Sequence, residues 1–309
     1  MFDEYAAGRT PNPDVLCNRE IKFDVFLEKA LALGADYVAT GHYCRRIDNP
    51  DGSASLYAGL DKNKDQSYFL CQVTQNQLLK SLFPVGELQK SEVREIAKEL
   101  DLVTADKKDS QGLCFVGKVS LPEFLQQQLK AKKGKVIEIP NDFTPLKEYH
   151  STPNDFDHIE QLVAPFEFKE SDGLEVATHQ GAHFYTVGQR KGLHIGGRPK
   201  PSFVLQVDTD NNLVFSGQES THLGLNRKAL SIDNKTLNFV NLKNQFKEGE
   251  KIRVQLRVRY RQPLKTATVL RTKDITYVLF DELERGITPG QFCAFYSEDQ
   301  ELIGSGVIN

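Results

Sequence analysis

Apolar residues recur at helical spacing near the start of the chain and predict a helix over residues 23–31. The residues on this apolar face are Phe23, Phe26, Leu27, Ala30 and Leu31, and Gly34 supplies a C-terminal cap. A β-prone run over residues 37–40 follows and leads into Gly41 and His42. A helix, a strand and a glycine-containing loop in this order indicate a parallel α/β sheet, which binds ligands beyond the carboxyl ends of its strands. Gly41 and His42 fall at that position, although Gly41 could also be a plain turn residue.

The α/β character continues to about residue 117. Residues 1–7 look like the end of a helix, and residues 47–60 predict a hairpin around the turn sequence Asn-Pro-Asp-Gly. Thr74 and Gln77 form a capping box for a helix over residues 75–82. A further helix is capped by Ser91 and carries Val93, Ile96, Ala97 and Leu100 on its apolar face. Another begins at Ser120, with Pro122 in its first turn, and runs to about Lys130.

From residue 132 onwards helical periodicity fades, and β-branched and aromatic residues alternate with turn residues. Residues 141–166 are rich in Pro, Asp, Asn and His and predict a long, mobile insertion. Regular short strands from residue 203 onwards predict a β-barrel. We therefore expect an α/β domain over residues 1–117, a small, mainly β domain over residues 118–200 and a C-terminal β-barrel over residues 201–309.

One predicted strand of this barrel, residues 251–262, alternates strictly between apolar and basic residues. Its apolar face consists of Ile252, Val254, Leu256, Val258 and Tyr260, and its basic face of Lys251, Arg253, Arg257, Arg259 and Arg261. A row of cations without an acid among them could contact phosphates. Such a face is also commonly no more than a solvated surface.

Composition limits the remaining possibilities. The chain has 309 residues, of which 39% are hydrophobic and 26% charged, and a net charge of −3. These values are typical of a globular protein with two or three domains, and only a local basic face could bind nucleic acid. No apolar run approaches the ~20 residues that span a bilayer, and the first residues do not form a secretory signal. Five cysteines without regular spacing indicate a reducing, cytoplasmic location with no membrane partner.

Two cysteines lie in polar loops and are candidates for chemistry. Residues 8–18 read GRTPNPDVLCN, and the two prolines predict a stiff loop rather than a helix, which delivers Asp14 and Cys17 to one place. Cys114 lies in a second, glycine-containing loop, DSQGLCFVG. Both thiols could also be small buried hydrophobes.

Other classes of chemistry fit less well. The sequence has no CxxC or HExxH and its histidines are scattered, so we expect no metal site. It has no GxSxG elbow for a serine hydrolase, and a Cys17–His42 protease would leave Cys114 without a role. Two loop cysteines fit redox or sulfur-transfer chemistry better, because thiolates attack sulfur readily and can close a transient disulfide.

Six motifs, in order along the chain, resemble those of the tRNA-specific 2-thiouridylase family. They are GRTPNPDVLCN, ALGADYVATGHY, KDQSYFL, DSQGLCFVG, YTVGQRKGL and RVRYRQ. The resemblance covers essentially the whole chain. It implies an adenine-nucleotide alpha-hydrolase-like first domain, truncated at its N-terminus, and replacement of the C2 oxygen of the wobble uridine by sulfur after adenylation with ATP and Mg.

The resemblance also implies partners and residue roles. The partners are tRNAs for Lys, Glu and Gln, together with a cysteine desulfurase or a sulfur-relay protein that donates persulfide sulfur; no bound metal or organic cofactor is expected. Cys114 matches the persulfide-carrying cysteine, Cys17 the thiol that closes a transient disulfide with it, and Asp14 fits a general acid/base. Gly41 matches an ATP-contacting position. Asn12, Pro13 and Asp14 match the segment that touches the target uridine, and the remaining tRNA contacts match His42, Lys64, Asp65, Gln66, Arg259, Tyr260 and Gln291.

One departure from the family is clear. The SGGxDSS-type pyrophosphate-binding loop with which the family opens has no counterpart in this sequence. We therefore expect an N-terminally shortened family member with an incomplete ATP site. The alternatives are a tRNA-binding protein without catalysis, which impaired nucleotide binding would favour, and a thiol redox protein, which an absence of tRNA binding would favour.

Overall fold

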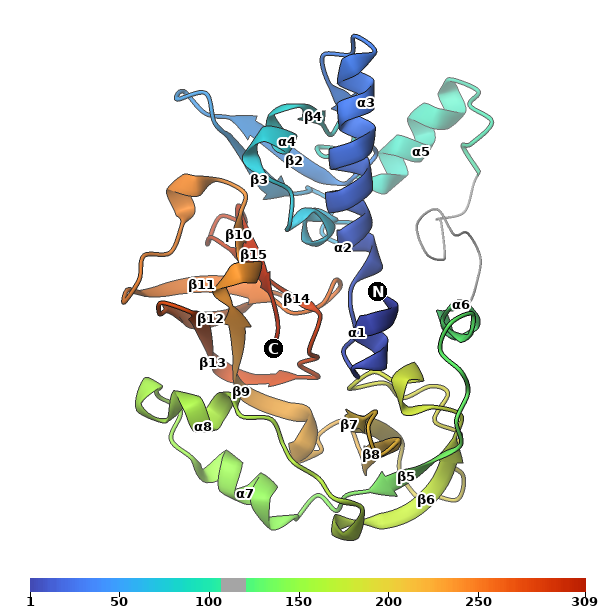
Figure 1. Ribbon diagram of the computed structural model, residues 1–309. Helices are drawn as coiled ribbons and strands as arrows, with labels where there is room; N and C mark the ends of the chain where they lie inside the picture. Colours follow the sequence, from blue (N-terminus) through green and yellow to red (C-terminus); the bar gives the residue numbers. More distant parts are fainter. Residues whose placement is uncertain (107–120) are drawn as a thin grey trace.

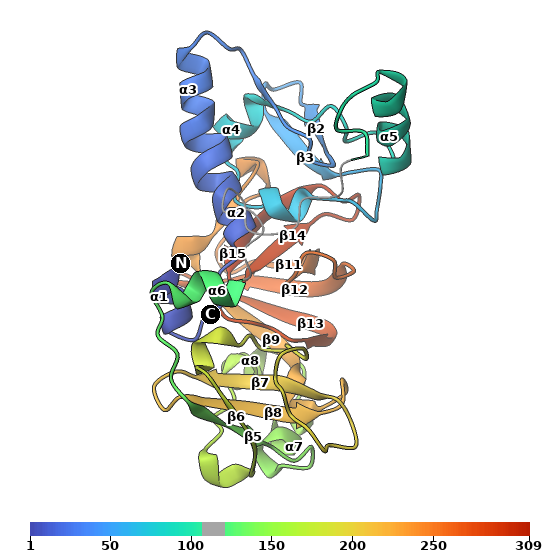
Figure 2. The same ribbon diagram turned by 90° about the vertical axis from the view of Figure 1, so that its right-hand side faces the viewer.

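The molecule is built in three tiers whose order in space differs from their order along the chain. The computed structural model describes residues 1–106 and 121–309. Figures 1 and 2 show most of the N-terminal region at the top, the C-terminal sheet in the middle and the central region of the chain at the bottom, while the first helix, residues 2–6, lies lower down between the other two tiers. The C-terminal sheet therefore packs against both other parts.

The N-terminal region combines short helices with two small sheets. β1 (Val38–Ala39) pairs in parallel with β4 (Ser81–Leu82), as an α/β unit requires. β2 (Cys44–Asp48) and β3 (Ala54–Ala58) form an antiparallel hairpin, which confirms the prediction for residues 47–60. The helices are α1 (Phe2–Ala6), α2 (Pro13–Cys17), α3 (Phe26–Ala32), α4 (Gln75–Leu79) and α5 (Lys90–Glu99).

The prediction that residues 8–18 form a loop throughout is wrong from Pro13 onwards. Pro13 occupies the first turn of α2, where a missing N–H costs nothing, and the Asn12 side chain accepts a hydrogen bond from the Val15 N–H at 3.2 Å. A π-helical segment, Asn18–Val25, then continues directly into α3. Residues 13–32 therefore form one continuous rod (Figure 1).

The two later helices differ from prediction at their ends. The capping box of Thr74 and Gln77 is confirmed, but α4 ends at Leu79 because the next residues form β4. α5 is capped by Gln89 rather than Ser91, since the Glu92 carboxylate accepts the Gln89 N–H. Its apolar side is not buried: Ile96 is 42% exposed.

The central sheet has the strand order β6-β5-β8-β7. Its strands are β5 (Gly134–Glu138), β6 (Leu174–His179), β7 (Ser202–Asp208) and β8 (Leu213–Gln218). β8 pairs in parallel with β5 and antiparallel with β7. Residues 202–218 thus belong to this sheet, in contrast to the division expected at residue 200, because alternation alone does not tell which sheet a strand joins.

Residues 141–166, expected to be a long, mobile insertion, contain helices that pack on the rest of the protein. This segment forms α7 (Thr144–Ser151) and α8 (Ile159–Val163), and α6 (Leu121–Gln126) lies before the central sheet. Leu162 is fully buried, in one apolar cluster with Tyr149, Ala229 and Leu279. The helices are thus held by their packing on the C-terminal sheet, which overrides the local preference for turns.

The C-terminal sheet has seven strands in the order β10-β15-β14-β11-β12-β13-β9. They are β9 (Asn226–Asp233), β10 (Asn238–Phe239), β11 (Lys251–Arg257), β12 (Lys265–Arg271), β13 (Ile275–Arg285), β14 (Phe292–Tyr296) and β15 (Leu302–Val307). Every residue of β14 is buried. Successive side chains of a strand alternate between the two faces of its sheet. Phe292 and Tyr296 therefore pack against the N-terminal region on one face, and Cys293 and Phe295 belong to the apolar cluster on the other face.

Candidate functional site

The three tiers meet at Thr10, the residue before Pro11. Its N–H donates to the Pro289 carbonyl at 2.9 Å, and its carbonyl accepts from Gln291 Nε2 at 2.8 Å. Its hydroxyl lies 3.1 Å from the hydroxyl of Thr186 in the glycine-rich loop of the central region. Thr10 lies within the first motif, but no role was predicted for it from the sequence.

Beside this junction, two residues predicted to contact tRNA come together. Asn12 Nδ2 donates to Gln291 Oε1 at 3.3 Å, while Asn12 also caps α2. Gly290, with φ +90°, lets the chain pass closely: a Cβ there would lie 3.0 Å from the Thr10 nitrogen. The start of α2 is therefore fixed on the loop before β14.

Asp14 and Cys17 lie one helical turn apart on α2 and so share a side of the rod. Asp14 is half-buried, and Cys17 is a free, buried thiol, 7% exposed. The next residue, Asn18, donates from Nδ2 to the Phe69 carbonyl at 2.9 Å and anchors this end of α2. Cys114 lies outside the described residues, so its pairing with Cys17 stays a prediction.

Gly41 and His42 follow β1, as predicted. The His42 ring packs with Phe23 and Phe83, and Nδ1 lies 2.8 Å from the Thr40 hydroxyl. Burial, with a smaller contribution from the Lys22 charge, lowers the pKa of His42 to about 4. The imidazole is therefore neutral near pH 7. A Cβ on Gly41 would meet no atom of residues 1–106 or 121–309 within 4 Å, so these residues leave the surface beyond β1 open at this point.

In the KDQ segment, residues 64–66, Asp65 and Gln66 form hydrogen bonds to other parts of the protein. The Asp65 carboxylate is buried and accepts hydrogen bonds from the Ser67 N–H at 3.0 Å and from Arg257 Nη2 at 2.9 Å. Gln66 is paired with the residue after His42: its Oε1 accepts the Tyr43 N–H, and its own N–H donates to the Tyr43 carbonyl. These bonds fix the segment beside both the His42 loop and the C-terminal sheet.

The cations predicted to form a phosphate-binding row are mostly bound to the protein itself. Arg259 Nη2 donates to the Val187 carbonyl and the Thr288 hydroxyl, both at 2.6 Å, and burial lowers its pKa. Arg257 pairs with Asp65, and Arg253 forms an exposed pair with Asp281. The expectation of a uniformly free basic face therefore fails, because partners far away in sequence reach these side chains.

Tyr260 is the aromatic member of this region. Its ring centroid lies 4.1 Å from that of Phe69, and burial raises its pKa. With Lys62, Arg261 and the Asp65–Arg257 pair, Tyr260 lines a cavity of about 490 Å³ between the loop after β3 and the end of β11. Of the residues predicted to contact tRNA, Asp65 and Tyr260 thus line the same cavity.

Residues 1–106 and 121–309 contain neither a candidate metal cluster nor a candidate membrane-spanning helix. No three His, Cys, Asp or Glu side chains there gather in an arrangement that could hold a metal ion. None of the helices in that part of the chain is both long and apolar enough to span a membrane.

Comparison with known protein families identifies the class of each domain. Three family models match in succession: a tRNA methyl transferase HUP domain over residues 1–118, a tRNA methyl transferase PRC-barrel domain over residues 158–218 and an aminomethyltransferase beta-barrel domain over residues 230–308. They define a protein with a HUP-type α/β domain followed by two β domains. The expected fold class is thereby confirmed.

Three similar proteins share one name. The chain is 54% identical to the tRNA-specific 2-thiouridylase MnmA of Christiangramia forsetii and 53% identical to that of Flavobacterium johnsoniae, in each case over 100% of this chain and 79% of the relative. The MnmA of Streptococcus thermophilus is 42% identical over 99% of this chain and 73% of its own length. The chain belongs to the tRNA-specific 2-thiouridylase (MnmA) family.

Proposed function

We propose that this protein forms 2-thiouridine in tRNA. The observation that carries the proposal is 54% identity over the whole chain with a tRNA-specific 2-thiouridylase. The geometry gives further support, since the Asn12–Gln291 contact fixes the start of α2, which carries Asp14 and Cys17, against the C-terminal sheet. This joint would hold an extruded base and the reacting thiol in one place.

The reaction we propose requires activation of a poor leaving group, the C2 oxygen of uracil. ATP with Mg supplies the adenylyl group for this activation. The described residues fit one part of such a site: Gly41 lies beyond the carboxyl end of the parallel strand β1, where α/β sheets bind nucleotides, and the space at its Cα is open.

We assign the sulfur chemistry to Cys17, the last residue of α2, and to Cys114. Cys114 carries the persulfide, received from a cysteine desulfurase or a sulfur-relay protein. Either Cys17 attacks Cys114 Sγ first and expels the terminal sulfur as hydrosulfide, which then attacks C2, or the terminal sulfur attacks C2 while still bound to Cys114 and is released afterwards by Cys17. In both cases AMP leaves C2 and a Cys17–Cys114 disulfide is formed. Asp14, one turn before Cys17 on the same side of the rod, serves as general acid/base at the edge of the base.

The tRNA contacts fall into two groups. We assign direct contacts to Asn12, Pro13, Asp14, His42, Lys64, Tyr260 and Gln291. Asp65, Gln66 and Arg259 support the same surface from within, because their polar groups already bond to Arg257, Tyr43 and Thr288. His42 would act as a neutral hydrogen-bonding group and not as a cation. The substrates we expect are tRNAs for Lys, Glu and Gln.

The decisive experiment is thiolation of unmodified tRNA by this chain with Mg-ATP, a cysteine desulfurase and L-cysteine, followed on a mercury-containing gel. A retarded tRNA band is expected. Cys17→Ser and Cys114→Ser should abolish it, whereas Cys293→Ser, at a buried thiol inside the C-terminal sheet, should retain it. In a single turnover without reductant, mass spectrometry should find a Cys17–Cys114 disulfide in proportion to thiolated tRNA.

Two outcomes would replace this proposal. If the chain retains tRNA on a filter but yields no retarded band, it is a tRNA-binding protein without catalysis. If Cys17 and Cys114 form a disulfide at the same rate without tRNA, and tRNA does not bind, the protein is a thiol redox protein.

A further inference from the structure

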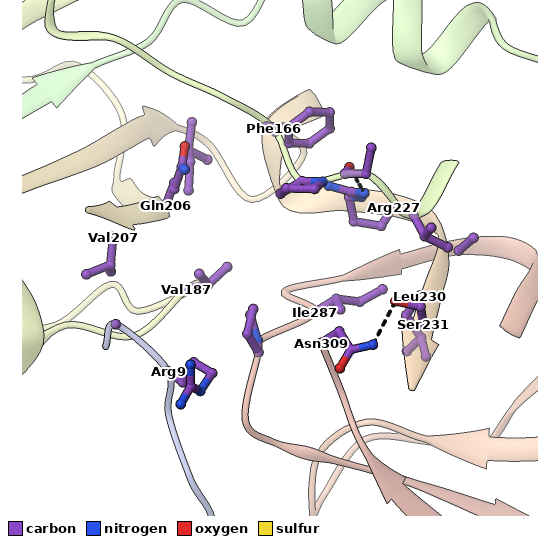
Figure 3. Close-up of a pocket in the computed structure, with 18 of the residues that line it drawn as sticks. Arg9, Phe166, Val187, Gln206, Val207, Arg227, Leu230, Ser231, Ile287 and Asn309 are labelled. Atoms are coloured by element: carbon purple, nitrogen blue, oxygen red, sulfur yellow. Dashed lines mark hydrogen bonds between the residues drawn. The ribbon is translucent and has the colours of Figure 1, made fainter. Parts of the chain in front are cut away.

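One cavity lies away from the proposed reaction site and has no role in it. It has a volume of about 660 Å³, within the range of small-molecule sites, and lies where residues 7–9, the turn after α8, β7 and β9 meet. Its walls are mainly aliphatic, with Val187, Leu205, Val207, Leu225 and Ile287 among the lining residues. Figure 3 shows Arg227 and Phe166 on one side of it and Arg9 and Val187 on another.

Arg227 is the unusual residue of this cavity. Its guanidinium carbon lies 4.8 Å from the ring centre of Tyr149 and 4.5 Å from that of Phe166. Nη2 donates to the carbonyls of Leu162 and Ala164, whereas Nε is buried without a partner. Among the described residues no carboxylate pairs with it, and burial lowers its pKa. A desolvated cation without a counter-ion is costly, and an anion that entered the cavity would offset that cost.

Glu160, the side-chain carboxylate on the cavity wall, does not fill this role. It accepts a hydrogen bond from the hydroxyl of Tyr277 on β13 and forms no ion pair with Arg227. Arg9, across the cavity, is paired with Glu4. The cavity therefore combines an apolar interior with one guanidinium that has no carboxylate partner among the described residues.

We propose that this cavity binds a small organic carboxylate with an apolar body, the carboxylate facing Arg227 and the hydrocarbon part lying along Val187, Val207 and Ile287. A charged guanidinium forms stronger hydrogen bonds to a carboxylate than to a neutral carbonyl. Hydrogen bonds from Arg227 would therefore replace those that the carboxylate loses when it leaves water. The inference does not depend on the proposed reaction, because no residue of this cavity belongs to the assigned cysteine or tRNA-contacting residues.

Octanoate is the test ligand and 1-octanol its uncharged match. Methyl NMR titrations of the full chain should shift Ile287 and Val187 on addition of octanoate but leave Ile137, in the core of the central sheet, unchanged. Arg227→Gln should weaken octanoate binding about tenfold or more and leave octanol binding unaltered, whereas Arg227→Lys should retain most of the affinity for octanoate. Val207→Phe, which fills the cavity, should abolish both.

Three results would overturn the proposal. They are no shift at Ile287 with millimolar octanoate, equal binding of octanoate and octanol to the wild-type chain, or octanoate binding unaffected by Val207→Phe. A thermal melt of each variant establishes that it is folded. If Arg227→Gln does not fold, Arg227→Lys, Val207→Phe and the comparison of the two ligands decide.

Discussion

His42 is the titratable residue with the clearest consequence for stability. Its pKa falls from 6.5 to about 4 on folding, because the buried ring cannot be solvated as a cation. The unfolded chain therefore binds the proton first as the pH falls. The contribution of His42 to the free energy of unfolding is complete above pH 6.5. It is lost as the pH falls from 6.5 to about 4, and the loss amounts to about 3 kcal/mol at most.

His42→Gln should remove this part of the pH dependence while leaving a neutral group near Thr40. Urea unfolding at about pH 5 and about pH 7.5 measures it: the free energy of unfolding should fall less with pH in the variant than in the wild type. Equal pH dependence in the two proteins would show that His42 is protonated in the folded state.

Asp65 and Arg257 form a second residue-scale pair whose burial can be tested. Their side chains are 5% and 11% exposed, and Arg257 also stacks on Tyr296 with 4.9 Å between guanidinium carbon and ring centre. Asp65→Asn leaves a desolvated guanidinium without its anion, so the free energy of unfolding should fall by about 3 kcal/mol.

The same strand provides the control for this pair. Arg253, also on β11, pairs with Asp281, but their side chains are 60% and 40% exposed. Asp281→Asn should therefore change the free energy of unfolding by less than about 1 kcal/mol. Similar losses for both variants in urea unfolding would mean that the Asp65–Arg257 pair is solvated.

At the scale of elements, two short helices with similar apolar spacing have opposite environments. Leu162 on α8 is fully buried beside β9 and β13, whereas Ile96 on α5 is 42% exposed. Leu162→Ala should lower the free energy of unfolding by about 3 kcal/mol through lost burial and a cavity. Ile96→Ala should cost less than about 1 kcal/mol. Urea unfolding compares them, and a larger effect of Ile96→Ala would reverse the assignment of these helices.

Elements that depend on neighbouring residues could be predicted from the sequence, whereas elements that depend on distant residues could not. The hairpin over residues 47–60, the capping box of Thr74 and the alternation of β11 rest on neighbours in sequence, and the structure contains all of them. α8 and the place of β7 in the central sheet depend on partners far along the chain. The start of α2 was predictable in principle, since a proline preceded by asparagine fits a first turn as well as a loop.

In the candidate site, too, some residues could be identified from the sequence, while the contacts of others could not. Motif resemblance singled out Asn12 and Gln291, which lie 3.3 Å apart between polar atoms. It did not indicate that Asp65 and Arg259 would be engaged by the protein, because the residues that engage them, Arg257 and Val187, are fixed only by the tertiary fold. A charged residue in a motif is therefore not by itself a nucleic-acid contact.

At the scale of the whole molecule, the C-terminal sheet holds the other two tiers, and Gly290 lies where the N-terminal region joins it. Its φ of +90° disfavours any side chain, and a Cβ would lie 3.0 Å from the Thr10 nitrogen and 3.1 Å from its carbonyl carbon. Gly290→Ala should therefore both strain the turn and push the chain before α2 away from the sheet.

Gly249→Ala separates these two effects. Gly249 has a φ of +79°, but a Cβ there would meet nothing within 4 Å, so this variant carries the backbone strain alone, about 1 kcal/mol. Gly290→Ala should cost at least about 1 kcal/mol more and should speed hydrogen exchange of the Thr10 amide, which bonds to Pro289 across the joint. If the two variants lose equal stability and Thr10 exchange is unchanged, the tiers are held together elsewhere, most directly by Tyr68, whose hydroxyl donates to the Phe292 carbonyl at 3.0 Å.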